Sequence, residues 1–572
     1  MQCNFFKTAI QLLFFSLVIS FCFPLCAQQS DPDEFYSLLS EARKLTTERK
    51  WNEAVLAWEQ VTDRNPVNGE YIANLADAYY NSANYTKAIE AYKKQIETGY
   101  GLAYVAVYNI ACCYALAAKK ELALEWLQRS FDMGFRSYTH AQNDADFKSI
   151  RNDPRFLKIL ALEDLSKMSR TEGWRYDMEL MRKEVMRKAF LRRGLSLDDF
   201  NKQYKELYNS IDKKTDVQIT IALMKLMANV KDGHTALFLQ SRKEFRLSLP
   251  LQFYLFKEGV YIIATDQQHK NLLGTRVVGF DKKATDEVIK VLSPIHSRDN
   301  ESGLLNTLAG SLRIPTLLNG LNLISDPGKV ELQLMDTNGK KFNAIIKADT
   351  TVARVDHKSV PATWVTLYQA TGKPIPSYLK DPKSNYWFAR IPGTNVVYLQ
   401  WNQVRNDSKE PLNAFTDRLF EYINKNDVDK LVIDLRWNNG GNTMLLPYFI
   451  NSVIRNDKIN KRGNLFVITG RRTFSAAQNL STFLEKQTNA TFVGEPTGSS
   501  PNFVGEEDFI TLPYSKLAMN VSDLFWQSSW PWDQRTWIAP SLYIPPTFKD
   551  YNANKDAALQ AIVKLVETKK AF

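Results

Sequence analysis

The alternation of strand and helix patterns over residues 385–572 constrains the fold of this chain most. Residues 396–400 predict a strand and residues 415–423 a helix. Residues 431–435 form a nearly continuous apolar run that ends at glycines, which is typical of a buried parallel strand. Residues 465–469 form a similar run, and another helix pattern follows it. This order predicts an α/β core with its functional site at the strand ends.

A repeat of 34 residues precedes this region. Aromatic and small residues recur in three copies: Trp51, Ala54 and Trp58; Tyr85, Ala88 and Tyr92; Ala123 and Leu127. The pattern resembles tetratricopeptide repeats, which implies an all-α solenoid over residues 28–165. Such a solenoid would offer a surface to a peptide or protein partner. A spacer without a ligand is the alternative.

The middle of the chain combines a helical and a β-rich pattern. Residues 166–244 have a helix-spaced apolar face, and residues 245–350 contain short strands with a hairpin signal at Asn338 and Gly339. The β-rich order resembles a divergent PDZ-like module. The Pro-rich residues 351–384 predict a linker. A chain of 572 residues also fits about three or four domains, so the fold class is multidomain.

The N-terminal pattern predicts export. Lys7 precedes an apolar run over residues 9–23, and Ala27 offers a small residue for cleavage, so residues 1–27 are interpreted as a signal peptide. A retained membrane anchor is the alternative. No other run approaches 18 apolar residues, so no transmembrane segment is expected after cleavage. The predicted location is periplasmic or secreted, and the adjacent Cys112 and Cys113 predict no disulfide.

Charge and motif searches exclude several function classes. The formal charge of +11 falls to +10 once Lys7 is removed, and the chain lacks basic–aromatic nucleic-acid motifs, so no nucleic-acid partner is expected. Phosphate-binding Gly-x-x-x-x-Gly-Lys, zinc-binding His-Glu-x-x-His and paired Cys-x-x-Cys motifs are all absent. We therefore expect no cofactor and no metal.

Three short segments carry chemistry: residues 231–235, 432–442 and 473–478. Ser475 follows a strand and opens a helix, so it is either a plain N-cap or a nucleophile favoured by the helix N-terminus. Gly440 and Gly441 form either a tight turn or bare backbone that offers N–H groups to a substrate carbonyl. A single histidine such as His234 is structural more often than catalytic.

Together the segments resemble the tail-specific (C-terminal-processing) and tricorn-core family of serine peptidases. Asp-Leu-Arg-x-Asn-x-Gly-Gly matches residues 434–441, Phe-Ser-Ala-Ala matches 474–477, and Gly-Glu-Pro-Thr-Gly matches 494–498. The resemblance implies a crotonase-like α/β core that hydrolyses peptide bonds through an acyl-enzyme without a metal. It also implies the site roles: the nucleophile is Ser475, the base is His234, and the backbone oxyanion donors are Ala476 with Gly440 or Gly441.

The chain departs from both branches of the family. The Ser-Lys branch has a lysine 25 residues after the nucleophile, where this chain has Ser500. The tricorn-type branch has a serine before the histidine, where this chain has Gly233, and a glutamate that completes the relay. The orienting acid is therefore left open among Asp232, Glu495 and Asp533.

Two functions follow from these patterns. The first is an exported serine peptidase that hydrolyses envelope or extracellular proteins or peptides. The second is a catalytically degenerate peptidase-fold protein that binds peptides or proteins through its repeats. The retained nucleophile, histidine and glycine pair favour the enzyme, whereas the missing relay residues favour the binding protein.

Overall fold

The computed structural model describes residues 32–160, 162, 164–188, 194–350 and 360–565. The chain divides into two compact units, Met1–Asp164 and Leu165–Phe572. The predicted signal peptide, residues 1–27, lies outside the described residues. No helix in the described ranges combines the length and the apolar character that a membrane crossing requires.

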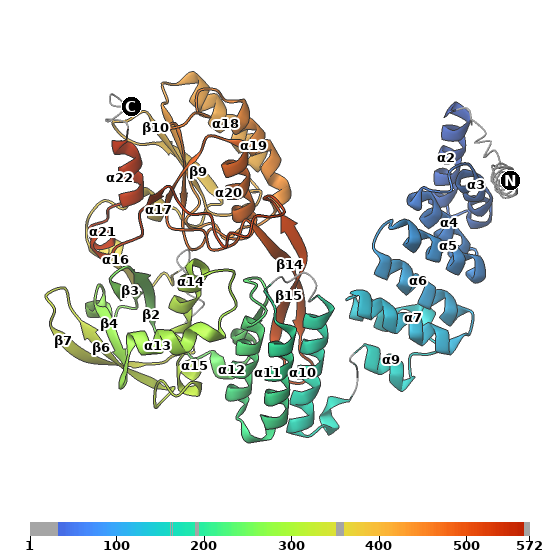
Figure 1. Ribbon diagram of the computed structural model, residues 1–572, viewed down its shortest axis with the longest axis horizontal. Coiled ribbons are helices and arrows are strands. Elements are labelled where there is room, and N and C mark those ends of the chain that lie inside the picture. The colour runs from blue at the N-terminus through green and yellow to red at the C-terminus, as the bar shows by residue number, and fades with distance from the viewer. Residues whose placement is uncertain (1–31, 161, 163, 189–193, 351–359, 566–572) are drawn as a thin grey trace, which may run out of the picture. The chain divides into compact units, whose positions relative to one another are not determined.

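The first unit is built from antiparallel helix pairs (Figure 1). The small repeat residues Ala54, Ala88 and Ala123 are fully buried, because neighbouring helices cross closely there. This confirms a helical N-terminal region, whereas the tetratricopeptide assignment stays a prediction. The helices are α2 (Pro32–Thr47), α3 (Trp51–Arg64), α4 (Gly69–Asn81), α5 (Tyr85–Thr98), α6 (Ala103–Leu116), α7 (Lys120–Met133), α8 (Tyr138–Asn143) and α9 (Pro154–Ile159).

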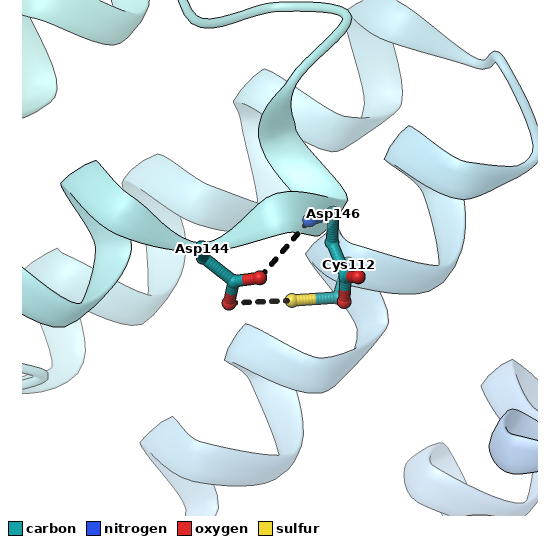
Figure 2. A group of neighbouring side chains, drawn as sticks. All are labelled: Cys112, Asp144 and Asp146. Atoms are coloured by element: carbon teal, nitrogen blue, oxygen red, sulfur yellow. Dashed lines mark hydrogen bonds between the residues drawn. The ribbon is translucent and has the colours of Figure 1, made fainter.

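A hydrogen-bonded junction closes this unit where α6 meets the turn η2 (Ala145–Phe147) (Figure 2). The Cys112 thiol lies 3.9 Å from Asp144 Oδ2 and donates to it, and the Asp146 N–H donates to Asp144 Oδ1 at 3.0 Å. The Tyr108 hydroxyl also donates to Asp144, at 2.6 Å. Burial raises the pKa of Cys112 well above its usual value, so the thiol keeps its proton. The junction therefore fixes helix packing.

The core of the second unit is a six-stranded sheet in the order β16-β13-β12-β11-β10-β9 (Figure 1). Only β9 runs antiparallel to its neighbour; the other pairs are parallel. This confirms the α/β region. The strands are β9 (Tyr386–Arg390), β10 (Val396–Trp401), β11 (Lys430–Asp434), β12 (Leu465–Thr469), β13 (Thr491–Gly494) and β16 (Leu542–Tyr543).

Both faces of this sheet are buried, which explains the apolar runs in the sequence. Val397, Ile433 and Val467 pack against three helices on one face. Val432 and Ile468 pack on the other face against a single helix. The three helices are α18 (Leu412–Lys425), α19 (Leu446–Arg455) and α20 (Ala476–Gln487), and the single helix is α22 (Ala557–Lys564).

A second sheet, in the order β2-β3-β4-β6-β7, is antiparallel, and β2 lies at its edge. Its assignment as a PDZ-like module stays a prediction. The strands are β2 (Leu251–Phe256), β3 (Gly259–Thr265), β4 (Arg276–Phe280), β6 (Lys329–Met335) and β7 (Lys341–Lys347), with β5 (Lys283–Ala284) paired to β4. The accompanying helices are α13 (Thr285–Leu292), α14 (Glu301–Ser311) and α15 (Pro315–Gly320).

A long hairpin from the C-terminal region joins the helical segment. Strands β14 (Asn502–Thr511) and β15 (Ala518–Gln527) pair with each other, and β15 pairs with β1 (Ala236–Phe238). Figure 1 shows the hairpin beside the helices that precede β1. They are α10 (Arg170–Arg187), α11 (Leu197–Ser210) and α12 (Asp216–Ala228). The predicted core, 385–572, thus contributes part of its chain to the predicted helical segment, 166–244.

The predicted linker, residues 351–384, needs a correction over its described part. Residues 360–384 form β8 (Val365–Thr366), which pairs with β3, and two short helices, α16 (Leu367–Ala370) and α17 (Ser377–Lys380). Leu367, Tyr378 and Leu379 are buried. Prolines in this stretch favour turns between short elements. The segment contacts both sheets, because β8 pairs with β3 and the Tyr378 carbonyl accepts a hydrogen bond from Gln400 of β10.

Candidate active site

Ser475 stands at the turn between β12 and α20. Its backbone has φ 54° and ψ −127°, a left-handed conformation that non-glycine residues rarely adopt. Its side chain makes no capping hydrogen bond, so the N-cap interpretation does not account for it. Strained backbone of this kind persists where the surrounding structure holds it, and it is common at catalytic sites.

The glycine pair lies directly against this turn. A Cβ atom at Gly440 would lie 2.6 Å from Ser475 Cβ and 2.9 Å from the Ala476 nitrogen. The φ of Gly440 is also +110°, so this position requires glycine for two reasons. The backbone N–H of Phe474 donates to the carbonyl of Asn438 at 3.2 Å, which fastens the two loops together.

The backbone donors around Ser475 are not equivalent. The Gly440 N–H donates to Asn438 Oδ1 at 3.0 Å, so a neighbouring side chain already occupies it. Within the described ranges, the N–H groups of Ala476 and Gly441 make no hydrogen bond. Of the predicted oxyanion donors, Ala476 and Gly441 are therefore the two whose hydrogens remain available to a substrate.

His234 is brought to the same place from a segment 241 residues earlier in the chain. Its ring stacks on Phe474, the residue before Ser475, with centroids 4.3 Å apart, and lies parallel to Phe503 at 5.4 Å. The side chain is 4% exposed. Gly233 makes this approach feasible, because a Cβ there would lie 2.9 Å from the Phe474 ring.

The electrostatics of His234 favour a neutral imidazole. Burial lowers the pKa of His234 to about 4, although the negative charge of Asp232 and the backbone of Val504 act in the opposite direction. No described residue forms a well-aligned hydrogen bond to either ring nitrogen, and Ser475 is no exception. Ser475 and His234 thus lie in segments that contact each other through Phe474, without a direct hydrogen bond between the two side chains.

Asp232 is the candidate acid that lies beside His234. Its Oδ1 accepts the His234 backbone N–H at 2.9 Å and lies 4.0 Å from the ring Nδ1. Its Oδ2 accepts the hydroxyls of Thr235 and Ser522, both at 2.6 Å. The buried carboxylate therefore ties the His234 loop to strand β15 and holds a negative charge near the ring.

The other two candidate acids are bound elsewhere. Glu495 forms a two-pronged ion pair with Arg471, at 2.5 and 3.2 Å. Asp533 accepts from Arg535 and from the Ser529 hydroxyl, and the Arg535 hydrogen bond lowers the pKa of Asp533 to about 2. Neither carboxylate has a recorded contact with His234, so the structure does not support either as its orienting acid.

The sequence analysis missed Asp299, the residue that links two of the site loops. Its carboxylate accepts the Gly233 N–H at 2.7 Å and the hydroxyl of Ser499. Burial, followed by the charge of Asp232, raises the pKa of Asp299 to about 6. No local signal identifies it, because Asp299 precedes the N-cap Asn300 of α14 and looks like an ordinary loop residue.

No protein-family model and no curated protein matches the sequence. Similar solved structures include mature CPAF complexed with lactacystin, with 11% identity, 69% of this chain and 97% of that chain covered, and a TM-score of 0.49. The photosystem II D1 C-terminal processing protease has 14% identity, coverage of 65% and 93%, and a TM-score of 0.31. A putative peptidase from Parabacteroides merdae has 12% identity, coverage of 70% and 99%, and a TM-score of 0.37.

Peptidases of the kind that the sequence motifs resemble are thus among the solved structures similar to this chain.

Proposed function

We propose that this chain is a serine peptidase that hydrolyses peptide bonds through an acyl-enzyme on Ser475. The observation that carries the proposal is the strained Ser475 turn packed against Gly440, with an unbonded Ala476 N–H beside it. The strained Ser475 backbone, the close Gly440 and the unbonded N–H serve no evident packing purpose. This combination suits a nucleophile that lies next to an oxyanion site.

The reaction follows from these groups. Ser475 Oγ attacks the carbonyl carbon of the scissile bond, and its proton passes to the neutral imidazole of His234. The Ala476 and Gly441 N–H groups stabilise the negative carbonyl oxygen. The carbon–nitrogen bond then breaks, and the amine leaves with the proton from His234. Water attacks the resulting ester, which releases the acid and restores the Ser475 hydroxyl.

His234 is the proposed base because it needs no deprotonation at neutral pH. Its ring stacks on Phe474, one residue from the proposed nucleophile, and the mechanism requires that the ring turn a nitrogen toward Ser475. Asp232 is the proposed orienting acid, since its carboxylate faces Nδ1 at 4.0 Å. A negative charge at that distance favours the imidazolium that forms during the reaction.

A fluorophosphonate probe tests the proposal. We expect covalent labelling of the intact protein, no labelling of Ser475→Ala, and slow labelling of His234→Ala. Ser500→Ala is the matched control, because the Ser500 hydroxyl only donates to the Thr536 carbonyl, so this variant should label normally. If the folded protein forms no covalent adduct, the result would contradict the peptidase proposal and favour the alternative of a binding protein.

The proposal extends to location and partners. The pattern of residues 1–27 supports export to a periplasmic or extracellular space, where the substrates would be proteins or peptides. N-terminal sequencing of the mature protein tests this: a first residue near 28 supports export, and an intact N-terminus contradicts it. The helical unit is the proposed site for a protein partner.

A further inference from the structure

The second unit contains a cavity of about 770 Å³ that reaches the loops of the candidate active site. Strand β2 and helix α14 contribute to its wall. Trp437 and Arg472 also line it, and each lies three residues before a site residue: Gly440 and Ser475, respectively. A peptide bound at Ser475 would therefore have this space next to it.

The cavity wall is strongly biased in charge. Arginines at positions 246, 313, 471 and 472 line it, and its lining residues include no aspartate or glutamate. Arg471 is neutralised by its ion pair with Glu495. His296 also lines the cavity; burial, and then Arg298, lower its pKa to about 4, so it is neutral at pH 7. Arginines are thus the charged side chains of the wall.

Arg313 is the exceptional member of this set. It is 6% exposed, yet its guanidinium makes only one recorded hydrogen bond, from Nη2 to the Leu249 carbonyl at 3.2 Å. Its Nε has no partner among the described residues, and none of them forms an ion pair with it. It also lies over the Trp364 ring, 5.7 Å from the centroid. Burial alone lowers the pKa of Arg313 to about 10, so it stays charged at neutral pH.

A buried cation without a counter-ion is unfavourable, and an incoming anion would relieve it. The guanidinium has several unused N–H groups in a planar fork, which matches the two oxygens of a carboxylate. The apolar part of the wall includes Phe253 and Leu255 of β2, whose position at the sheet edge leaves room for an extended chain. These features together favour a carboxylate that is carried on a peptide.

We propose that this cavity is a specificity subsite for a carboxylate of the peptide substrate, with Arg313 as the residue that pairs with it. The proposal rests on the proposed peptidase function for the position of the peptide. The carboxylate has two sources, an acidic side chain near the scissile bond or the C-terminus of the peptide. Both present the same two oxygens to the same guanidinium.

Direct binding separates this proposal from the proposed function, because it needs no turnover. Fluorescent peptides are titrated into the full-length Ser475→Ala protein as matched pairs: glutamate against glutamine at each position, and free C-terminus against amide. We expect the carboxylate member of one pair to bind at least about tenfold more tightly. A preference in the first pair identifies a side chain, and one in the second identifies the terminus.

The variant Arg313→Gln, in the same background, should reduce that ratio to about one, whereas Arg313→Lys should keep part of it. Arg390→Gln, at the exposed end of strand β9, is the control, and it should leave the ratio unchanged. Equal binding within every pair by the Ser475→Ala protein would overturn the proposal, even if Arg313→Gln failed to fold. A ratio that survives Arg313→Gln would also overturn it.

The failure of each proposal looks different. If the fluorophosphonate probe does not label the protein but the carboxylate preference depends on Arg313, the subsite stands and the peptidase function falls. If the probe labels the protein and no carboxylate preference exists, the peptidase function stands and the subsite proposal falls.

Discussion

Ser475 and His234 are proposed to act as one unit, so their effects on turnover should not add. We expect Ser475→Ala and His234→Ala each to reduce kcat/KM about a thousandfold or more, and the double variant to be hardly worse than either. Hydrolysis of a short unstructured peptide measures this. Additive losses would mean that the histidine acts independently of the serine, and near-normal turnover by His234→Ala would exclude it as the base.

The pH profile should reflect the buried position of His234. Because burial lowers its pKa from 6.5 to about 4, the imidazole is neutral and able to accept a proton well below pH 6.5. We expect the apparent pKa of the acidic limb of the kcat/KM profile to lie below 6.5. Asp299 titrates nearby, with a pKa of about 6, so the same profile is measured for Asp299→Asn. An apparent pKa that stays near 6.5 in both the parent protein and Asp299→Asn would contradict the proposal that a buried, neutral His234 is the base.

Asp299 also makes stability depend on pH. Its pKa is 3.8 when unfolded and about 6 when folded, so its contribution to stability is present below about pH 4 and is lost as the pH rises through 6. Asn in its place keeps an acceptor for the Gly233 N–H without the charge. The stability of Asp299→Asn relative to the parent should therefore rise between pH 4.5 and 7.5, by roughly 2 kcal/mol. Urea unfolding at the two pH values measures it, and a constant difference would contradict the shift.

At the scale of elements, the hairpin β14–β15 depends on helix α10. At the hairpin turn, the N–H groups of Tyr514 and Ser515 donate to the buried Asp177 carboxylate at 2.8 and 2.7 Å. The Tyr514 ring fills the space above Gly173, where a Cβ would lie 2.1 Å from it. The hairpin is thus held by one acid and one glycine of the same helix.

Loss of that acid should destabilise the second unit. Asp177→Ala leaves two backbone N–H groups without their partner, which costs about 2 to 4 kcal/mol. Asp177→Asn keeps one acceptor and should lose less. Calorimetric unfolding of the full chain measures both, with the exposed Asp212→Ala as the control. Equal stability of Asp177→Ala and the control would show that the hairpin does not depend on this contact.

The same elements explain what the sequence could predict. Strands β11 and β12 and the turns after them follow from local patterns, because an apolar run and a glycine pair need only their neighbours to be recognised. Asp299 and Ser522 could not be found in that way, because their partners Gly233 and Asp232 are 66 and 290 residues away. The departures from the family pattern likewise left three candidate acids open. Asp232 is close to His234 in the sequence, but only the fold shows that its carboxylate lies 4.0 Å from the ring and that Glu495 and Asp533 pair with arginines instead.

At the scale of the whole molecule, the two compact units suggest separate roles. If the helical unit recruits a partner, a chain that begins at residue 165 should cleave short unstructured peptides at nearly the full rate and cleave a native protein target more slowly. Paired assays on both substrates measure this. An equal loss of cleavage rate on both substrates would mean that the helical unit supports the peptidase region. Full cleavage rates on both substrates would exclude a role of the helical unit in recruitment.

The pairing of β1 with β15 has a consequence for biosynthesis. The register joins Leu237 to Met519, so the loop that carries His234 lacks its sheet partner until almost the whole chain has left the ribosome. Such distant pairings form late, because the chain must close a long loop first. Helices α2 to α7 contact mainly their sequence neighbours, so they can fold during synthesis. A hydrolase built in this order would stay inert while nascent, which protects the cell that makes it.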